Sequence, residues 1–452
     1  MEKNLTIGSV FKNVILFSLP YLLSYFLQTL YGMADLFIIG QFEGVASTTA
    51  VSIGSQVMHM LTVMIVRLAM GTTVSIGQAI GAGDRKQAAK DIGNTVTLFM
   101  AVSIALMAVL LVLVHPIISA MSTPTEAVKG TSAYLTICFI GVPFITAYNI
   151  ISSIFRGMGD SESPMYFIAV ACAANIGLDY LFMGILRLGP AGAALGTTLS
   201  QAVSVAVSLT VILKRKKIVL KEDDFKPYRP VMGKILKIGV PIAFQDGLIQ
   251  IAFIIITIIA NQRGLNDAAA VGIVEKVIGF LFLIPSSMLS TVSALGAQNI
   301  GAGKPERAFQ TLRYAILLTV GFGMLSSIVI QFAAEPIVSL FTDRNAEGGA
   351  DVIRLGGQYL RGYIWDSIFA GIHFSFSGYF CARGKSGLSF LHNILAIALV
   401  RIPGVHLTSQ LFPETLFPMG LATAAGSLTS VVICIIAFTV IRRKDRQLAL
   451  GG

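Results

Sequence analysis

Two polar residues four positions apart, Asn175 and Asp179, lie in the middle of an apolar stretch that runs from about Pro164 to Leu188. Residues at i and i+4 share one face of a helix, so the spacing predicts an amide and a carboxylate side by side. A carboxylate at mid-bilayer depth costs about 2.5–3.5 kcal/mol on insertion scales, and such a group normally faces a partner, an ion or a water-filled cavity. We therefore predict a cation or proton site here. A structural polar contact between helices is the alternative.

Three further residues have the chemistry to complete that site. Asp35 lies near the end of the first apolar stretch, and Gln28 precedes it by two helical turns on the same face. Two carboxylates in one poorly solvated site cannot both stay ionised and unpaired, so one holds a proton or a cation sits between them. Thr197 offers a hydroxyl just after the small residues 189–196, which allow two helices to pack closely. Oxygen ligands alone suit a hard ion such as sodium and disfavour zinc or copper.

Three more acids fall inside apolar stretches of the second half of the chain: Asp246, Glu275 and Asp366. Asp366 directly follows Trp365, and an acid next to an aromatic ring can hold an organic cation. We expect these three acids to contact the substrate, with contacts between helices as the alternative. Arg401 also lies in an apolar stretch, and the sequence assigns it no role.

The elements that position these residues follow from composition. The chain has 452 residues and a mean hydropathy of +0.78, with 55% hydrophobic and only 12% charged residues, which excludes an ordinary soluble globular domain. Apolar runs of 18 or more residues recur along the chain, and each is long enough to cross a bilayer as a helix. We predict an all-α integral membrane protein with twelve transmembrane helices, at about 14–40, 47–76, 92–115, 130–154, 164–187, 191–213, 235–260, 269–295, 310–334, 355–381, 387–411 and 418–441.

The basic residues predict an orientation. With both termini in the cytoplasm, 24 of the 33 Lys and Arg residues fall in cytoplasmic segments, against six in outer segments. This bias explains the net charge of +10 as membrane topology, so we expect no nucleic-acid partner. The predicted location is the cell membrane, crossed many times.

The chain repeats itself. Gln78-Ala-Ile-Gly-Ala-Gly-Asp84 returns 220 residues later as Gln298-Asn-Ile-Gly-Ala-Gly-Lys304, and Arg156-Gly157 has a counterpart in Arg383-Gly384. Both copies of each motif fall on the predicted cytoplasmic side, so the halves are related as parallel repeats. We predict two pseudo-symmetric six-helix bundles, an N-terminal lobe at 1–220 that carries the ion site and a C-terminal lobe at 221–452. The charged segment Lys214–Pro230 is the expected linker.

The Gly-Ala-Gly segments resemble phosphate-binding loops only superficially. No Lys-Ser or Lys-Thr follows them and no strand is expected before them. Glycine here more simply permits the left-handed turn that ends a helix. We also find no HExxH motif, no cluster of metal-binding side chains and no nucleophile with an evident base, so we expect neither an enzyme nor a cofactor.

Taken together, the twelve spans in two parallel halves, the paired Gly-Ala-Gly segments, the paired Arg-Gly motifs and Asn175-x-x-x-Asp179 resemble the multidrug and toxic compound extrusion (MATE) family over essentially the whole chain. The resemblance implies two six-helix lobes around a central cleft. It implies export of organic cations and other amphipathic drugs by alternating access, driven by inward movement of protons or sodium, in a protein that works as a monomer.

The resemblance also implies roles for particular residues. The family's ion site corresponds to Asp35, Asn175, Asp179 and Thr197, with Gln28 and Tyr134 as looser matches, and Tyr134 is a candidate substrate contact. Some branches place a coupling glutamate on the seventh helix, where this chain has Ile249, so the N-terminal site is favoured. A flippase for a lipid-linked saccharide, a relative built on the same helical scale, is the alternative. It would need several arginines inside the spans, where this chain has more acids than bases.

Overall fold

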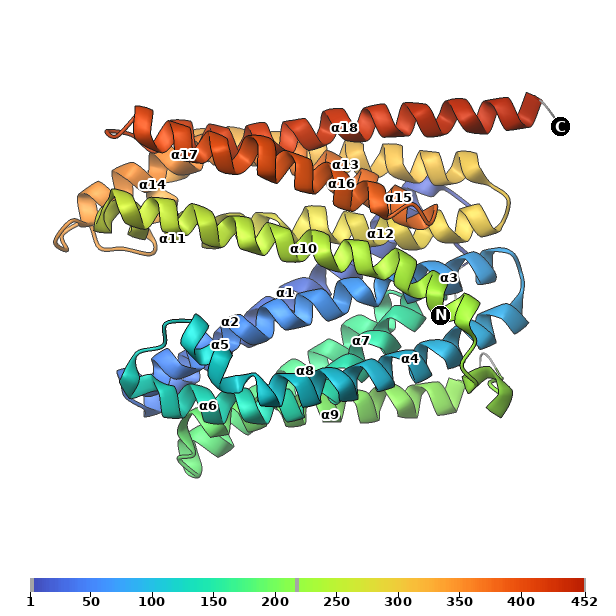
Figure 1. The fold of residues 1–452 in the computed structure, drawn as a ribbon, viewed down its shortest axis with the longest axis horizontal. Helices are drawn as coiled ribbons and strands as arrows, with labels where there is room; N and C mark the ends of the chain where they lie inside the picture. The colour runs from blue at the N-terminus through green and yellow to red at the C-terminus, as the bar shows by residue number, and fades with distance from the viewer. Residues whose placement is uncertain (1–3, 216–218, 451–452) are drawn as a thin grey trace. The chain divides into compact units, whose positions relative to one another are not determined.

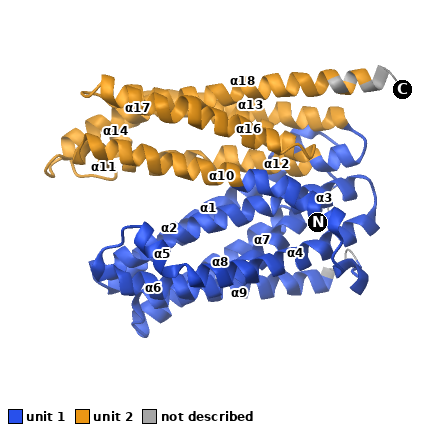
Figure 2. Cartoon of the chain, viewed as in Figure 1, with its two compact units in different colours: residues 1–243, 297–304 blue, residues 244–296, 305–452 orange. Residues whose placement is uncertain are grey.

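The computed structural model describes residues 4–215 and 219–450, which form helices joined by short turns (Figure 1). Residues 216–218, part of the predicted linker, lie outside the described residues. The chain divides into two compact units, residues 1–243 with 297–304 and residues 244–296 with 305–452 (Figure 2). This division by packing is distinct from the lobes at 1–220 and 221–452, which stay a prediction.

The first unit contains the elements that carry the Asn175–Asp179 site. Its helices are α1 (Val10–Phe42), α2 (Val45–Leu68), α3 (Met70–Gly81), α4 (Arg85–Val112), α5 (Val114–Ala120), α6 (Thr125–Ile140), α7 (Val142–Gly157), α8 (Glu162–Asp179), the π-helix η1 (Tyr180–Ile185), α9 (Gly189–Arg215) and the short 3₁₀ helix η2 (Glu222–Phe225).

Two helices belong partly to each unit, α10 (Arg229–Arg263) and α12 (Leu283–Gly301). The second unit contains the others: α11 (Leu265–Leu281), α13 (Pro305–Ser339), α14 (Gly349–Tyr363), α15 (Asp366–Ala382), α16 (Gly387–Ala396), the π-helix η3 (Ile397–Arg401), α17 (Ile402–Leu411) and α18 (Phe417–Leu450).

All twelve predicted spans coincide with helices. Within the described residues, ten helical segments are long and apolar enough to cross a membrane, and α6 with α7 makes an eleventh if this pair, bent by 48°, is one span. The remaining predicted span, about 355–381, corresponds to α14 and α15, which are separated at Ile364 and Trp365. Neither helix alone reaches the length of a membrane span, with 15 and 17 residues, and α14 carries charged residues, including Arg354 and Arg361. The predicted all-α membrane fold is confirmed.

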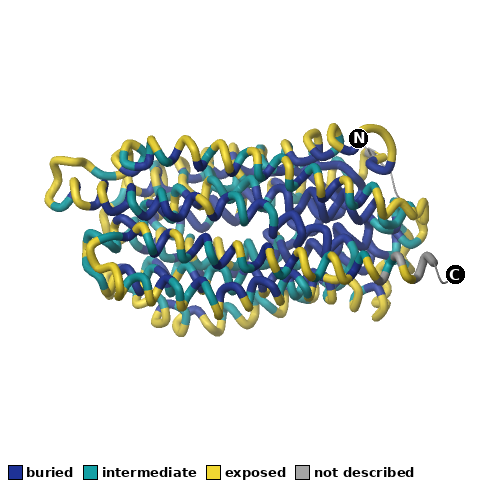
Figure 3. The backbone as a smooth tube through the Cα atoms, turned by 90° about the horizontal axis from the view of Figure 1, so that it is seen from above, coloured by how far each residue is buried: buried dark blue, intermediate teal, exposed yellow. Residues whose placement is uncertain are grey.

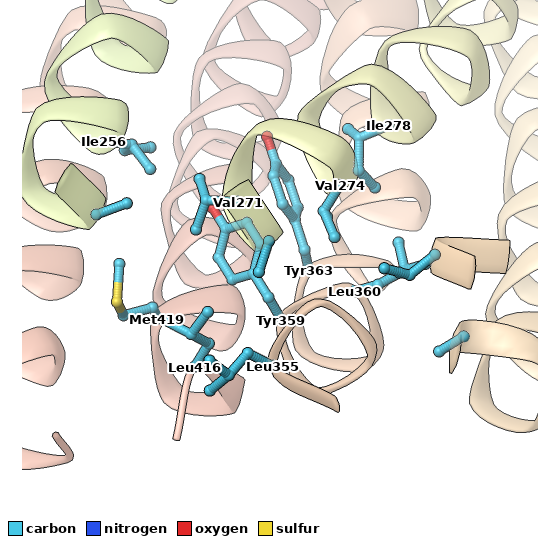
Figure 4. Close-up of a cluster of buried hydrophobic side chains, with 14 of the residues drawn as sticks. Ile256, Val271, Val274, Ile278, Leu355, Tyr359, Leu360, Tyr363, Leu416 and Met419 are labelled. Carbon is cyan, nitrogen blue, oxygen red and sulfur yellow. The ribbon is translucent and has the colours of Figure 1, made fainter. Parts of the chain in front are cut away.

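Many helices carry both buried and exposed residues along their length, whereas α3 and α15 are buried almost throughout (Figure 3). The exposed turns carry large apolar side chains, such as Phe37 at 67% and Phe332 at 82% exposure, as expected for surfaces that face lipid. The buried turns form separate apolar cores. The core of the second unit gathers side chains from α10, α11, α14 and α18 around the rings of Tyr359 and Tyr363 (Figure 4).

The repeated Gln-x-Ile-Gly-Ala-Gly segments meet in the first unit. A Cβ atom at Gly81 would overlap the carbonyl oxygen of Gln298, and one at Gly301 would overlap that of Gln78. The two contacts are reciprocal, as a two-fold relation between the repeats requires. Next to them, Gly83 and its counterpart Gly303 have φ of +74° and +68°. The predicted left-handed turns are therefore confirmed, and the motif adds a close backbone crossing to them.

The described part of the predicted linker is docked on α4. The Asn94 amide accepts from the backbone N–H of Tyr228 at 2.7 Å and donates to the carbonyl of Asp224 at 3.0 Å. The Thr97 hydroxyl donates to the carbonyl of Phe225 at 2.7 Å. Asn94 is fully buried, so these bonds fix the segment around η2 on the first unit.

We expect Gly81→Ala to destabilise the protein, by about 1–3 kcal/mol, because the added methyl group must push two packed helix ends apart. Thermal unfolding of the purified protein in detergent measures the effect. Gly32→Ala is the matched control, since a Cβ there meets nothing within 4 Å. Equal melting temperatures for the two variants would contradict the crossing.

We expect Asn94→Leu to release the linker, because a buried backbone donor and acceptor lose their partner at a loss of about 1–3 kcal/mol. Limited digestion with chymotrypsin is the measurement, since Phe225 ends η2 and Tyr228 follows it closely. Cleavage at these positions should be faster than in the unmodified protein. An unchanged rate would mean that Asn94 does not hold the segment.

Candidate functional site: a buried carboxylate pair

Three helices of the first unit bring the predicted ion-site residues together. Asp35 lies on α1, Asn175 and Asp179 on α8, and Thr197 on α9. Asp179 is the last residue of α8, where the α-helix changes to the π-helix η1. Such π segments are rare and occur often at functional sites, because the changed helical repeat re-aims side chains.

A glycine on α9 determines how close Asp179 comes. A Cβ atom at Gly196 would overlap Oδ1 of Asp179, so the carboxylate rests directly against the α9 backbone. Ala193 and Ala194, on the same helix, are fully buried. The predicted close packing of these two helices by small residues is confirmed.

The four side chains are removed from solvent. Asn175 and Asp179 are 0% exposed, Asp35 is 2% and Thr197 is 6% exposed. The Thr197 hydroxyl donates to Oδ2 of Asp35 at 3.0 Å. The carboxyl groups of Asp35 and Asp179 and the Asn175 amide are close enough to interact with one another, although no hydrogen bond of regular geometry joins them.

Most polar atoms of this cluster lack a partner among the described residues. They are Oδ1 of Asp35, both carboxylate oxygens of Asp179, and the oxygen and nitrogen of the Asn175 amide. Buried polar groups are normally hydrogen-bonded, so this concentration of unpaired oxygens requires an explanation. A proton shared by the carboxylates, or a cation bound between them, supplies it. Two carboxylates, an amide oxygen and a hydroxyl form a ligand set suited to a hard cation.

Two neighbours of the cluster were missed by sequence reasoning. The Tyr31 side chain, on α1, interacts with Asp35, Thr197 and Gln201. Gln201, on α9, is 6% exposed and its Oε1 has no partner in the described part of the chain. The available signal was helical spacing, because Tyr31 lies one turn before Asp35 and Gln201 one turn after Thr197.

The two looser matches lie on α1 and α6. Gln28 is half-buried on α1, two turns before Asp35. Tyr134 is 2% exposed, its ring packs on Gly54, and its hydroxyl lies 3.3 Å from the Ser55 hydroxyl. Tyr134 is thus part of the apolar core of the first unit, and its contact with substrate stays a prediction.

The three acids predicted to contact substrate lie on three different helices. Asp246 lies on α10 and is 7% exposed. Glu275, on α11, accepts from the Thr257 hydroxyl at 3.3 Å. Asp366, on α15, is bound by the guanidinium of Arg401 at 2.6 Å. These three belong to the second unit and Tyr134 to the first, so their common role also stays a prediction.

Comparison with known proteins decides the family. The MatE family model matches residues 20–181 and 241–407, which include one stretch in each half. This chain belongs to the MATE family. Members of the family are membrane transport proteins, and the predicted resemblance is confirmed.

Individual relatives support the assignment to this family. The chain is 27% identical to the probable multidrug resistance protein YpnP of Bacillus subtilis over 88% of both chains. It is 25% identical to an FAD transporter of Shewanella oneidensis over 74% of this chain and 75% of that one. A solved structure of a MATE protein in complex with MaL6 has a TM-score of 0.90 at 22% identity, covering 99% of both chains, and so has the same fold.

We expect Gly196→Ala to weaken cation binding by about 10–100-fold, as is typical when a group that positions a ligand is displaced. The new methyl group would occupy the position of Asp179 Oδ1. The measurement is the rise in melting temperature with sodium concentration, repeated as a function of pH. Gly177→Ala is the control, because a Cβ there meets nothing within 4 Å and the residue is only two positions from Asp179. If both variants respond like the unmodified protein, the glycine has no part in the site.

Proposed function

We propose that this MATE transporter is a cation-coupled antiporter, which uses inward movement of sodium or protons to export organic cations and other amphipathic compounds by alternating access. The single observation that carries the proposal is the pair of buried carboxylates, Asp35 and Asp179, whose oxygens have no sufficient partners. The site has the charge and the oxygen ligands of a place where a monovalent cation binds and leaves. Export of drugs is supported by relatives such as YpnP.

The first step of the proposed cycle is loading of the carboxylate pair from outside. Binding of a proton or sodium removes the repulsion between the carboxylates and allows α1, α8 and α9 to pack more tightly. Pro20 lies within α1 and removes a backbone hydrogen bond there, so this helix has a natural place to bend. The cation can shift the conformational equilibrium only by its difference in affinity for the two states.

The energetics require such coupling. Expelling a monovalent cation against an inside-negative potential costs about 2.3 kcal/mol per 100 mV. An ion that moves inward gains a similar amount for each charge, plus the energy of its own gradient. Exchange of one cation for another through the same protein therefore uses the ion gradient directly.

We also propose a location, an oligomeric state, an orientation and an arrangement of lobes. We place the protein in the cell membrane as a monomer with both termini in the cytoplasm, and assign the carboxylate pair to an N-terminal lobe at 1–220 and substrate contacts to a C-terminal lobe at 221–452. The support is the distribution of basic residues and the internal repeat. No cofactor or enzymatic reaction is required.

A lipid-linked saccharide flippase is the second candidate. A pyrophosphate headgroup needs unpaired cationic side chains inside the spans. The charged residues favour the antiporter, because Arg401 is neutralised by Asp366 and Lys276 is exposed. One relative is an FAD transporter, and FAD is an anion, so anionic substrates should be tested as well.

We expect Asp179→Asn to abolish ion-driven efflux while the protein remains folded in the membrane, because the amide can neither release a proton nor balance a cation. Ethidium efflux from everted vesicles, with sodium and pH gradients imposed separately, measures this. Asp223→Asn, at an exposed position in the linker segment, is the control and should transport normally. Normal efflux by Asp179→Asn would remove this residue from the mechanism.

A further inference from the structure

The second half of the chain contains a site of similar construction and opposite charge. Gly159 and Gly384 both have positive φ and both precede the next helix, α8 or α16, by three residues. When the two halves are aligned on these glycines, Arg401 falls beside the position of Asn175. The helix that carries an amide and an acid in the first half therefore carries a guanidinium at the same depth in the second.

Arg401, like Asp179, packs closely against a glycine of a neighbouring helix, although the contact is made by the base of its side chain and not by the charged group. A Cβ atom at Gly426, on α18, would lie 2.7 Å from the Cβ of Arg401. Asp179 rests against Gly196 on α9, the last helix of the first half, and Arg401 rests against Gly426 on the last helix of the second. Each charged residue also adjoins a π-helix, since η1 follows Asp179 and η3 ends at Arg401.

The two sites differ in how their charge is balanced. Arg401 donates to Oδ2 of Asp366 at 2.6 Å, and the two side chains are 9% and 0% exposed. A charge-assisted bond of this kind is strong, and loss of one partner leaves an uncompensated buried charge. Asp366 thus has an internal cation, whereas no salt bridge to Asp35 or Asp179 is formed within residues 4–215 and 219–450. The titratable groups around the pair are Glu275, Tyr359, Tyr363 and His373, with His392 packed against His373.

We propose that the Arg401 guanidinium is a covalently attached cation that permanently fills the cation position at the Asp366 carboxylate. The second half therefore takes no coupling ion, and the carboxylate pair of the first half alone responds to sodium or protons. Arg401 is a specificity-determining residue in this account: it decides which of two related sites is open to an exchangeable cation. The inference rests on the proposed function, since it assigns the coupling ion of that same transport cycle to one half.

The test uses purified full-length protein with the first site disabled by Asp35→Asn together with Asp179→Asn. The melting temperature is measured over a range of sodium concentrations and of pH. With Arg401 intact, this variant should show no sodium-dependent stabilisation. Adding Arg401→Gln should create a cation response, since Asp366 now needs a proton or sodium, and adding Asp366→Asn as well should remove it.

Two further variants are used if the single glutamine variant does not fold. They are Arg401→Lys and the neutral double variant Asp366→Asn with Arg401→Gln. In an otherwise unmodified protein, both should respond to sodium and pH as the parent does. The proposal is overturned if Asp35→Asn with Asp179→Asn keeps a sodium response that Asp366→Asn abolishes, or if the neutral double variant gains or loses one. Failure of the proposed function has a different signature, namely normal ion-driven efflux by Asp179→Asn.

Discussion

The structure depends on one electrostatic constraint, the burial of two carboxylates side by side without enough partners. Asp35 and Asp179 are nearly inaccessible, and among the described residues only one oxygen of the pair accepts a hydrogen bond of regular geometry, from Thr197. Such an arrangement is stable only when a proton or another cation compensates the charge. The packing of α1, α8 and α9 is therefore linked to the charge state of the pair, which is what the proposed coupling requires.

Glycine contacts bring the charged groups and helices to these positions. Gly196 admits the Asp179 carboxylate to the backbone of α9, and Gly426 admits Arg401 to α18. Gly81 and Gly301 let the two repeated helix ends cross at backbone distance in the first unit. The halves share this framework and differ in the charge that it holds. An exchangeable cation in one half and a covalently attached one in the other would leave a symmetric fold with a single coupling site.

Much of the fold could be predicted from the sequence, and so could the proximity of the acids in the first half. Hydropathy located the helices because a bilayer demands long apolar segments, and the predicted span at about 355–381 coincides with two shorter helices, α14 and α15. The proximity of Asn175 to Asp179 follows from helical spacing, and that of Asp35 from its similar depth. The pairing of Asp366 with Arg401 could not be predicted, since it joins residues 35 positions apart on different helices and depends on how those helices pack.

The most direct measurement of the central claim is infrared difference spectroscopy of the purified transporter as sodium or hydroxide is added. The account predicts that the carbonyl stretch of a buried carboxylic acid disappears when the cation that compensates the pair is exchanged or removed, and that this signal is absent when both acids are replaced, in Asp35→Asn with Asp179→Asn. A spectrum without any carboxylic acid band that responds to cations, or a band that persists unchanged in the double variant, would contradict it.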